Sequence, residues 1–96
     1  MIDFLKMCEI SDDVIKQIEK VNSSANLYNL NCNDLDTVKI IDFLRSVGVK
    51  CIEQLLIYKI DLFFTSYDMF KKKFNKYDVE KLVELINDDY NVIDKL

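Results

Sequence analysis

Cysteines and carboxylates are the side chains here that could do chemistry, because the sequence contains no histidine. Cys8, Cys32 and Cys51 lie 24 and 19 residues apart, a spacing that fits neither a disulfide framework nor a Cys-x-x-Cys pair. A zinc ion held by three thiolates would need a carboxylate as its fourth ligand. We interpret the cysteines instead as small hydrophobic core residues, whose free thiols fit a reducing compartment.

Paired carboxylates are the remaining route to acid–base catalysis. The pairs Asp12–Asp13 and Asp88–Asp89 are adjacent in sequence, which on a helix points their side chains away from each other. Glu80 and Glu84 share a helix face with a lysine and are typical of solvated surface. The sequence also has no glycine-rich phosphate loop and no nucleophile elbow.

Three alternating asparagines imitate part of a calcium-binding loop. Asn29, Asn31 and Asn33 have the spacing of its first, third and fifth positions. The sixth position is Asp34 where glycine is required, and the twelfth is Ile40 where a bidentate glutamate belongs. We therefore predict a non-enzymatic protein with no catalytic residue, no cofactor and no metal.

Length and composition favour one all-α domain that spans residues 1–96. Half of the residues are hydrophobic, and the chain has one glycine and no proline, which removes the residues that punctuate most all-β folds. No apolar run approaches the roughly 20 residues of a membrane-spanning helix. The first residues also lack a basic segment followed by an apolar stretch, so no signal peptide is predicted and the expected location is cytoplasmic.

Apolar periodicity predicts a compact domain of five to six helices arranged as short antiparallel hairpins. Ser11 and Asp78 are expected N-caps, Gly48 an expected left-handed C-cap, and the run Thr65–Asp68 resembles a capping box. A strand near residues 60–64 is an alternative, since that run is rich in β-formers. The helices are expected near residues 12–21, 34–47, 51–60, 67–74 and 79–86, with short turns at both ends. Leu35 is placed in the buried stripe of the second helix.

The segment from Asn22 to Asn33 is predicted to be an irregular and mobile loop. It contains five asparagines and two serines, which favour turns over helix interiors. Leu27, Tyr28 and Leu30 would act as its apolar anchors.

Ile2-Asp3-Phe4-Leu5-Lys6 recurs as Ile41-Asp42-Phe43-Leu44-Arg45, 39 positions later, which suggests an internal repeat. The second copy continues through Gly48-Val49, Leu55-Leu56 and Leu62-Phe63-Phe64. This pattern resembles the helix–helix–short-helix unit of mitochondrial transcription termination factor (mTERF-like) repeats over about a third of the chain. It departs from the family at Lys59-Ile60-Asp61, where a proline usually stands. The resemblance implies a superhelical stack of helices with a concave face that binds nucleic acid.

The acidic net charge of −4 conceals a basic middle. Residues 1–37 and 77–96 each sum to −4, whereas residues 38–76 sum to +4. Four of the lysines alternate with aromatic residues, as phosphate neutralisation and base stacking require, although an ordinary amphipathic helix has the same pattern. They are Lys71, Lys72, Lys73 and Lys76, interleaved with Tyr67, Phe70, Phe74 and Tyr77. A helix-turn-helix interpretation around Gly48 is disfavoured, because its second helix is too apolar to read bases.

These patterns predict a small acidic helical module that binds another protein or a second copy of itself, as a regulatory protein, inhibitor, adaptor or accessory subunit does. Inhibitors encoded by phages or plasmids are of this kind. Its contact anchors are expected at Leu27, Tyr28 and Leu30, or at Tyr90 near the C-terminal end. The alternative is a nucleic-acid-binding helical-repeat protein that uses segment 38–76, with Lys50 and Lys59 as further phosphate contacts. Neither a membrane nor a small-molecule substrate is expected as a partner.

Overall fold

The computed structural model describes residues 1–96 and consists of helices without any strand, which confirms the all-α prediction. The strand considered at residues 60–64 is wrong. A lone strand leaves its backbone groups without partners, and the chain has no second strand to pair with it. The helices, with η for 3-10 helices, are η1 (Asp3–Cys8), α1 (Asp12–Val21), α2 (Ser24–Cys32), α3 (Asp34–Ser46), α4 (Ile52–Tyr58), η2 (Ile60–Phe63), α5 (Tyr67–Phe74), α6 (Val79–Asp88) and η3 (Tyr90–Lys95).

Short polar side chains begin the helices much as the sequence indicates. Ser11 and Asp78 accept hydrogen bonds from N–H groups in the first turns of α1 and α6, which satisfies donors that have no partner within the helix. At α5 the predicted capping box is displaced by one residue. Ser66, rather than Thr65, accepts from the Met69 N–H at 3.2 Å.

The asparagine-rich segment is helix α2, so the prediction of an irregular loop is wrong. Ser23 caps this helix by accepting from the Asn26 N–H at 3.1 Å. Leu30 is completely buried and Leu27 is half-buried against the core. This tertiary burial and the cap outweigh the low helix propensity of asparagine.

Asn22 and Asn33 fix the two ends of α2 to the rest of the fold. The Asn22 carboxamide donates to the carbonyl of Ile57, at the end of α4, at 3.0 Å. The Asn33 carboxamide donates to the carbonyls of Phe63 and Thr65 at 2.7 and 2.9 Å. Asparagine is a residue type that favours turns, yet Asn22 and Asn33 hold α2 against α4 and η2.

One backbone motif occurs twice, 39 residues apart. Glu9 follows η1 with φ of 62°, and Gly48 follows the end of α3 with φ of 96°. In each copy the next residue, Ile10 or Val49, is buried, and its N–H donates to the carbonyl five residues back at 3.2 or 2.9 Å. These are Schellman-type helix ends. They confirm the prediction that Gly48 is the left-handed cap. The two helix ends are also separated by the same 39 residues as the repeated sequence Ile2–Lys6 and Ile41–Arg45.

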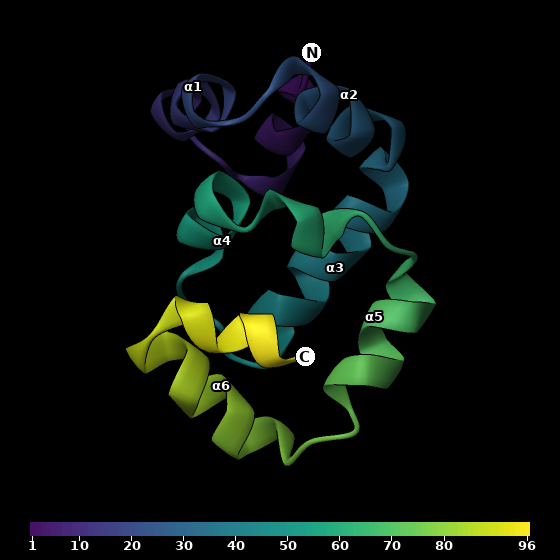
Figure 1. The fold of residues 1–96 in the computed structure, drawn as a ribbon, viewed down its shortest axis with the longest axis vertical. Helices are drawn as coiled ribbons and strands as arrows, with labels where there is room; N and C mark the ends of the chain where they lie inside the picture. Colours follow the sequence, from purple (N-terminus) through teal and green to yellow (C-terminus); the bar gives the residue numbers. More distant parts are fainter.

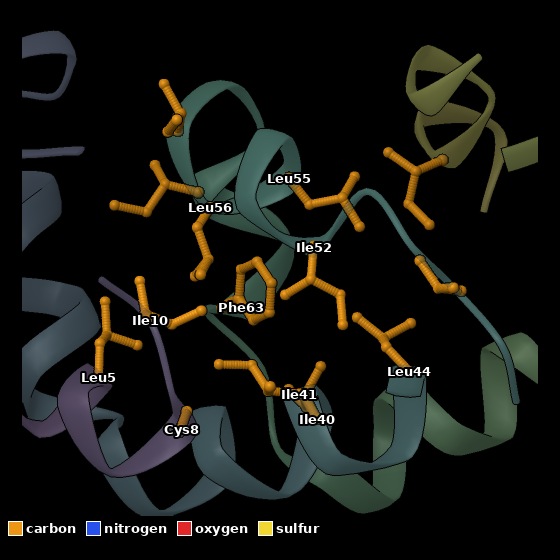
Figure 2. Packing of buried hydrophobic residues seen from close by; sticks show 14 of the residues in the cluster. Leu5, Cys8, Ile10, Ile40, Ile41, Leu44, Ile52, Leu55, Leu56 and Phe63 are labelled. Carbon is orange, nitrogen blue, oxygen red and sulfur yellow. The ribbon is translucent and has the colours of Figure 1, made fainter. Parts of the chain in front are cut away.

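The helices follow one another along the long axis of the molecule, which measures 35 Å. Figure 1 shows α1 and α2 at one end, α3 and α4 in the middle, and α5 and α6 at the other end. The middle helix α3 packs against both η1 and α5, while α1 packs on α4. Phe63 of η2 is fully buried, and Figure 2 shows it between the α4 residues Ile52 and Leu56 and the α3 residues Ile40 and Ile41.

Candidate interaction surfaces

Four exposed lysines lie on α5 or just after its end, and none of them forms an ion pair. They are Lys71, Lys72, Lys73 and Lys76. The ammonium of Lys71 lies 5.8 Å from the centroid of the Tyr67 ring, within the range of a cation–π contact. The positive charge of α5 is therefore available to a partner.

Three of these lysines share one surface, and the fourth does not. Lys71, Lys72 and Lys76 line a hollow of about 430 Å³. Lys71 also lines an adjoining hollow of about 490 Å³ between α3 and α5, together with Lys39. Lys73 lines a different hollow of about 400 Å³ between η2, α5 and η3, beside two aspartates. We name Lys39, Lys71, Lys72 and Lys76 the basic face; Asp42 and Asp68 lie along it.

The two phenylalanines between the lysines are not available for stacking bases. Phe70 and Phe74 are 2% and 0% exposed, and both pack edge-on against Phe43, with centroids 6.1 and 5.3 Å away. Tyr77 is exposed in part and donates its hydroxyl to the Lys95 carbonyl at 3.1 Å. The interleaved pattern therefore reflects an amphipathic helix that buries its phenylalanines.

Two further lysines of the basic segment lie apart from the basic face. The Lys59 ammonium contacts the Asp94 carboxylate at 2.7 Å, and this hydrogen bond raises the pKa of Lys59. The Lys50 N–H donates to the Asn87 side chain of α6 at 2.8 Å, which places Lys50 beside α6. Segment 38–76 is basic in sequence without forming one continuous basic surface.

The expected protein-contact anchors are only partly exposed. Leu30 is completely buried, so its assignment as a contact anchor is wrong. Leu27 and Tyr90 are half-buried, and the Tyr90 ring stacks on Tyr58 with centroids 5.9 Å apart. Tyr28 is 60% exposed and is the anchor that faces solvent.

Two exposed residues near the junction of α2 and α3 were not singled out as contacts from the sequence. Cys32 ends α2 and is exposed, and Leu35 in the first turn of α3 is 76% exposed, so its assignment to the buried stripe is wrong. The neighbouring Cys32 side chain raises the pKa of the Tyr28 hydroxyl. We name Tyr28, Cys32 and Leu35 the α2–α3 corner. The spacing of four residues places Tyr28 and Cys32 on one face of α2, and Leu35 follows in the first turn of α3.

Helix α2, which carries Tyr28 and Cys32 of the α2–α3 corner, is uncharged. None of the 17 acidic and 13 basic residues of the chain falls between positions 21 and 33. Leu35 stands between Asp34 and Asp36 in the first turn of α3, so the charge-free part of the corner is α2. The central parts of protein interfaces are depleted in charge and enriched in tyrosine, and the α2 part of the corner has both properties.

The side chains that could bind a metal ion or act as nucleophiles are dispersed over the structure. The cysteine, aspartate and glutamate side chains form no group of three or more that could hold a metal ion. Burial raises the pKa of the Cys8 and Cys51 thiols, which disfavours the nucleophilic thiolate.

No family model matches the chain, and no curated protein or solved structure matches it either. The mTERF-like resemblance therefore stays a prediction. None of the helices has the length and apolar character that crossing a membrane requires.

Proposed function

We propose that this chain is a non-enzymatic interaction module that binds a protein partner through the α2–α3 corner. The observation that carries the proposal is the exposure of Tyr28, at 60%, on a helix without charge, and of Leu35, at 76%, in the first turn of the next helix. Large apolar side chains in such a setting are typical binding anchors. An inhibitor, adaptor or accessory subunit in a reducing, cytoplasmic compartment fits these features and the three free thiols.

Rigidity of the corner supports the same function. Asn22 and Asn33 tie both ends of α2 to carbonyl groups of α4 and of the η2 region. A site that is already ordered loses little conformational entropy when it binds. The corner comprises one short helix and one turn, so we expect contact areas of the small, transient class, roughly below 1,200 Å² in total.

A pair of matched variants tests this surface. Leu35→Glu places a charge in the corner, and Leu85→Glu makes the same change at a 46% exposed leucine on α6. We expect a partner from the source cell to be retained by the immobilised wild type and by Leu85→Glu, and lost by Leu35→Glu. Equal retention of every captured protein by both variants, with unchanged circular dichroism, would refute the corner as the binding site.

A second candidate function is nucleic-acid binding by the basic face, as the mTERF-like resemblance implies. The observation that favours it is a set of four lysines with no ion-pair partner along two adjoining hollows. Four phosphate contacts would give a slope of log K against log salt of about −3.6 on duplex DNA and about −2.8 on a single strand.

Fluorescence anisotropy with single- and double-stranded oligonucleotides, in a salt series from about 50 mM, tests this candidate. Lys71→Glu with Lys76→Glu is expected to abolish binding. The matched control is Lys73→Glu, which lies off the basic face and should have a smaller effect. Absence of binding at the lowest salt would reject the candidate.

A further inference from the structure

We infer that the basic face binds single-stranded nucleic acid in preference to a duplex, with the Asp42 and Asp68 carboxylates accepting hydrogen bonds from the amino groups of unpaired bases. This inference rests on the second candidate function, because it names the form of nucleic acid that the same face takes. The acidic and aromatic side chains that lie among the lysines carry the argument.

Each of the two hollows along the basic face contains one carboxylate beside lysines. Asp68 lines the hollow on α5, and Asp42 lines the hollow between α3 and α5. Lys71 lines both hollows, so they belong to one surface. Both aspartates are exposed and neither forms an ion pair. Their oxygens can therefore accept hydrogen bonds from a ligand.

These carboxylates distinguish the two forms of nucleic acid. A duplex presents rows of phosphates on its outside, which repel a carboxylate and offer it no donor. The amino groups of paired bases lie inside the grooves, where a hollowed surface does not reach them. Unpaired bases expose their Watson–Crick edges, and the amino groups of cytosine, adenine and guanine donate to a carboxylate. A single strand therefore offers partners to the aspartates as well as to the lysines.

An aromatic surface in the hollow between α3 and α5 is the second argument. Phe43 and Tyr67 line this hollow and are both half-buried, with ring centroids 6.2 Å apart. The backbone of Tyr67 is fixed, since its N–H donates to the Asp36 carboxylate of α3 at 3.0 Å. Bases of a single strand have free faces that pack on aromatic rings, whereas base pairs inside a duplex are stacked on each other. The hollow thus combines lysines for phosphates with an apolar surface for a base.

The charge of the basic face sets the expected affinity. Its four lysines and two aspartates leave a net charge of +2, so we expect weak binding, with a Kd of roughly 1 to 100 µM at about 50 mM salt. Fluorescence anisotropy measures this binding with labelled strands of about 12 nucleotides. The probes are a cytosine-only strand, a thymine-only strand and a duplex of mixed sequence. The same single strands made of RNA, with uracil in place of thymine, identify which of the two nucleic acids is preferred.

The comparison of cytosine with thymine tests the role of the carboxylates, because thymine has no amino group. We expect the cytosine strand to bind at least about fivefold more tightly than the thymine strand, the lower end of what one good contact to a base edge contributes. We expect a margin of at least about fivefold over the duplex as well.

A matched pair of double variants completes the test. Asp42→Ala with Asp68→Ala removes both acceptors from exposed helical positions, and we expect it to bring the two strands within about twofold of each other and to tighten duplex binding. Glu19→Ala with Glu84→Ala removes two charges from α1 and α6, outside both hollows, and should keep the cytosine preference. Circular dichroism verifies that both variants are folded.

A duplex that binds as tightly as the cytosine strand would overturn the inference and leave the second candidate function in place. Equal binding of cytosine and thymine strands by the wild type, or a cytosine preference that survives the loss of both aspartates, would do the same. If no probe binds at the lowest salt, the second candidate function and this inference both fail.

Discussion

The hydrogen bonds of Asn33 make a quantitative prediction about what holds α2 in place. Its carboxamide donates to the carbonyls of Phe63 and Thr65 at 2.7 and 2.9 Å, 30 and 32 residues away in sequence. Asn33→Ala removes both donors and leaves two carbonyls without them. The side chain makes no capping bond to α3, so the substitution tests the long-range bonds alone.

Each of these bonds is expected to contribute about 1 kcal/mol, the usual net value for a partly buried hydrogen bond. The total destabilisation is therefore about 2 kcal/mol. For a domain of this size, a destabilisation of about 2 kcal/mol lowers Tm by roughly 8 to 16 °C. The same destabilisation is a large share of the roughly 5 to 15 kcal/mol free energy of unfolding of small domains.

Urea denaturation followed by circular dichroism measures this loss, with the slope m as a check that the unfolded state has not changed. Asn31→Ala is the matched control, since Asn31 is an exposed residue of the same helix; we expect a change within about 0.5 kcal/mol of zero. If the two variants lost the same stability, the claim that Asn33 anchors α2 would fail.

The structure makes three further predictions about stability and reactivity. The buried hydroxyl of Thr37 has no hydrogen-bond partner, so Thr37→Val should raise the free energy of unfolding by about 1 kcal/mol in the same urea assay. Gly48→Ala should lower the free energy of unfolding by about 1 to 2 kcal/mol, because alanine is strained at a φ of 96°. Glu9→Gly should raise the free energy of unfolding by roughly 0.5 to 1 kcal/mol. Effects of the same sign would contradict the assignment of both sites to the left-handed region. A thiol reagent at neutral pH should label one cysteine quickly and two slowly, and Cys32→Ser should remove the fast phase, since burial raises the pKa of the other two thiols.

The same pKa shift gives stability a defined dependence on alkaline pH. Burial holds the pKa of Cys8 above its ordinary value of 9.0, so the unfolded chain loses this proton first as the pH rises. The folded state then binds more protons than the unfolded state, and stability falls with increasing pH above about 9. Cys8→Ala should flatten this fall in urea midpoints measured between pH 8 and about 10, and an unchanged slope would reject the Cys8 thiol as its cause.

Local patterns allowed the sequence to predict some helices and not others. Helices α1 and α6 have buried residues on one side and a polar N-cap, and this information lies within each segment. Helix α2 has apolar residues on both sides, Leu30 inward and Tyr28 outward. Its ends are held by carbonyl groups about 30 residues away, and no local pattern contains that information.

The candidate surfaces depended in the same way on how helices are oriented in space. The sequence identified the α5 lysines, but only the packing of Phe70 and Phe74 against Phe43 separates Lys73 from Lys71. Leu35 fits a helical stripe equally well whether or not a neighbour covers it. Its exposure became evident only when the structure showed that α3 buries Thr37, Ile40, Ile41 and Leu44 instead.

The two left-handed helix ends are formed by different residues, Glu9 and Gly48, and this difference determines which part of the molecule unfolds first. Glycine takes a positive φ at little cost, whereas glutamate at Glu9 gives up about 1 kcal/mol or more. Strain at a helix end lowers the free energy of local opening, so the segment beside it opens before the better-held elements. Native-state hydrogen exchange should therefore detect a subglobal opening in which η1 and α1 exchange together while α3 and α4 stay protected. Partial unfolding would then begin at the N-terminal end of the molecule.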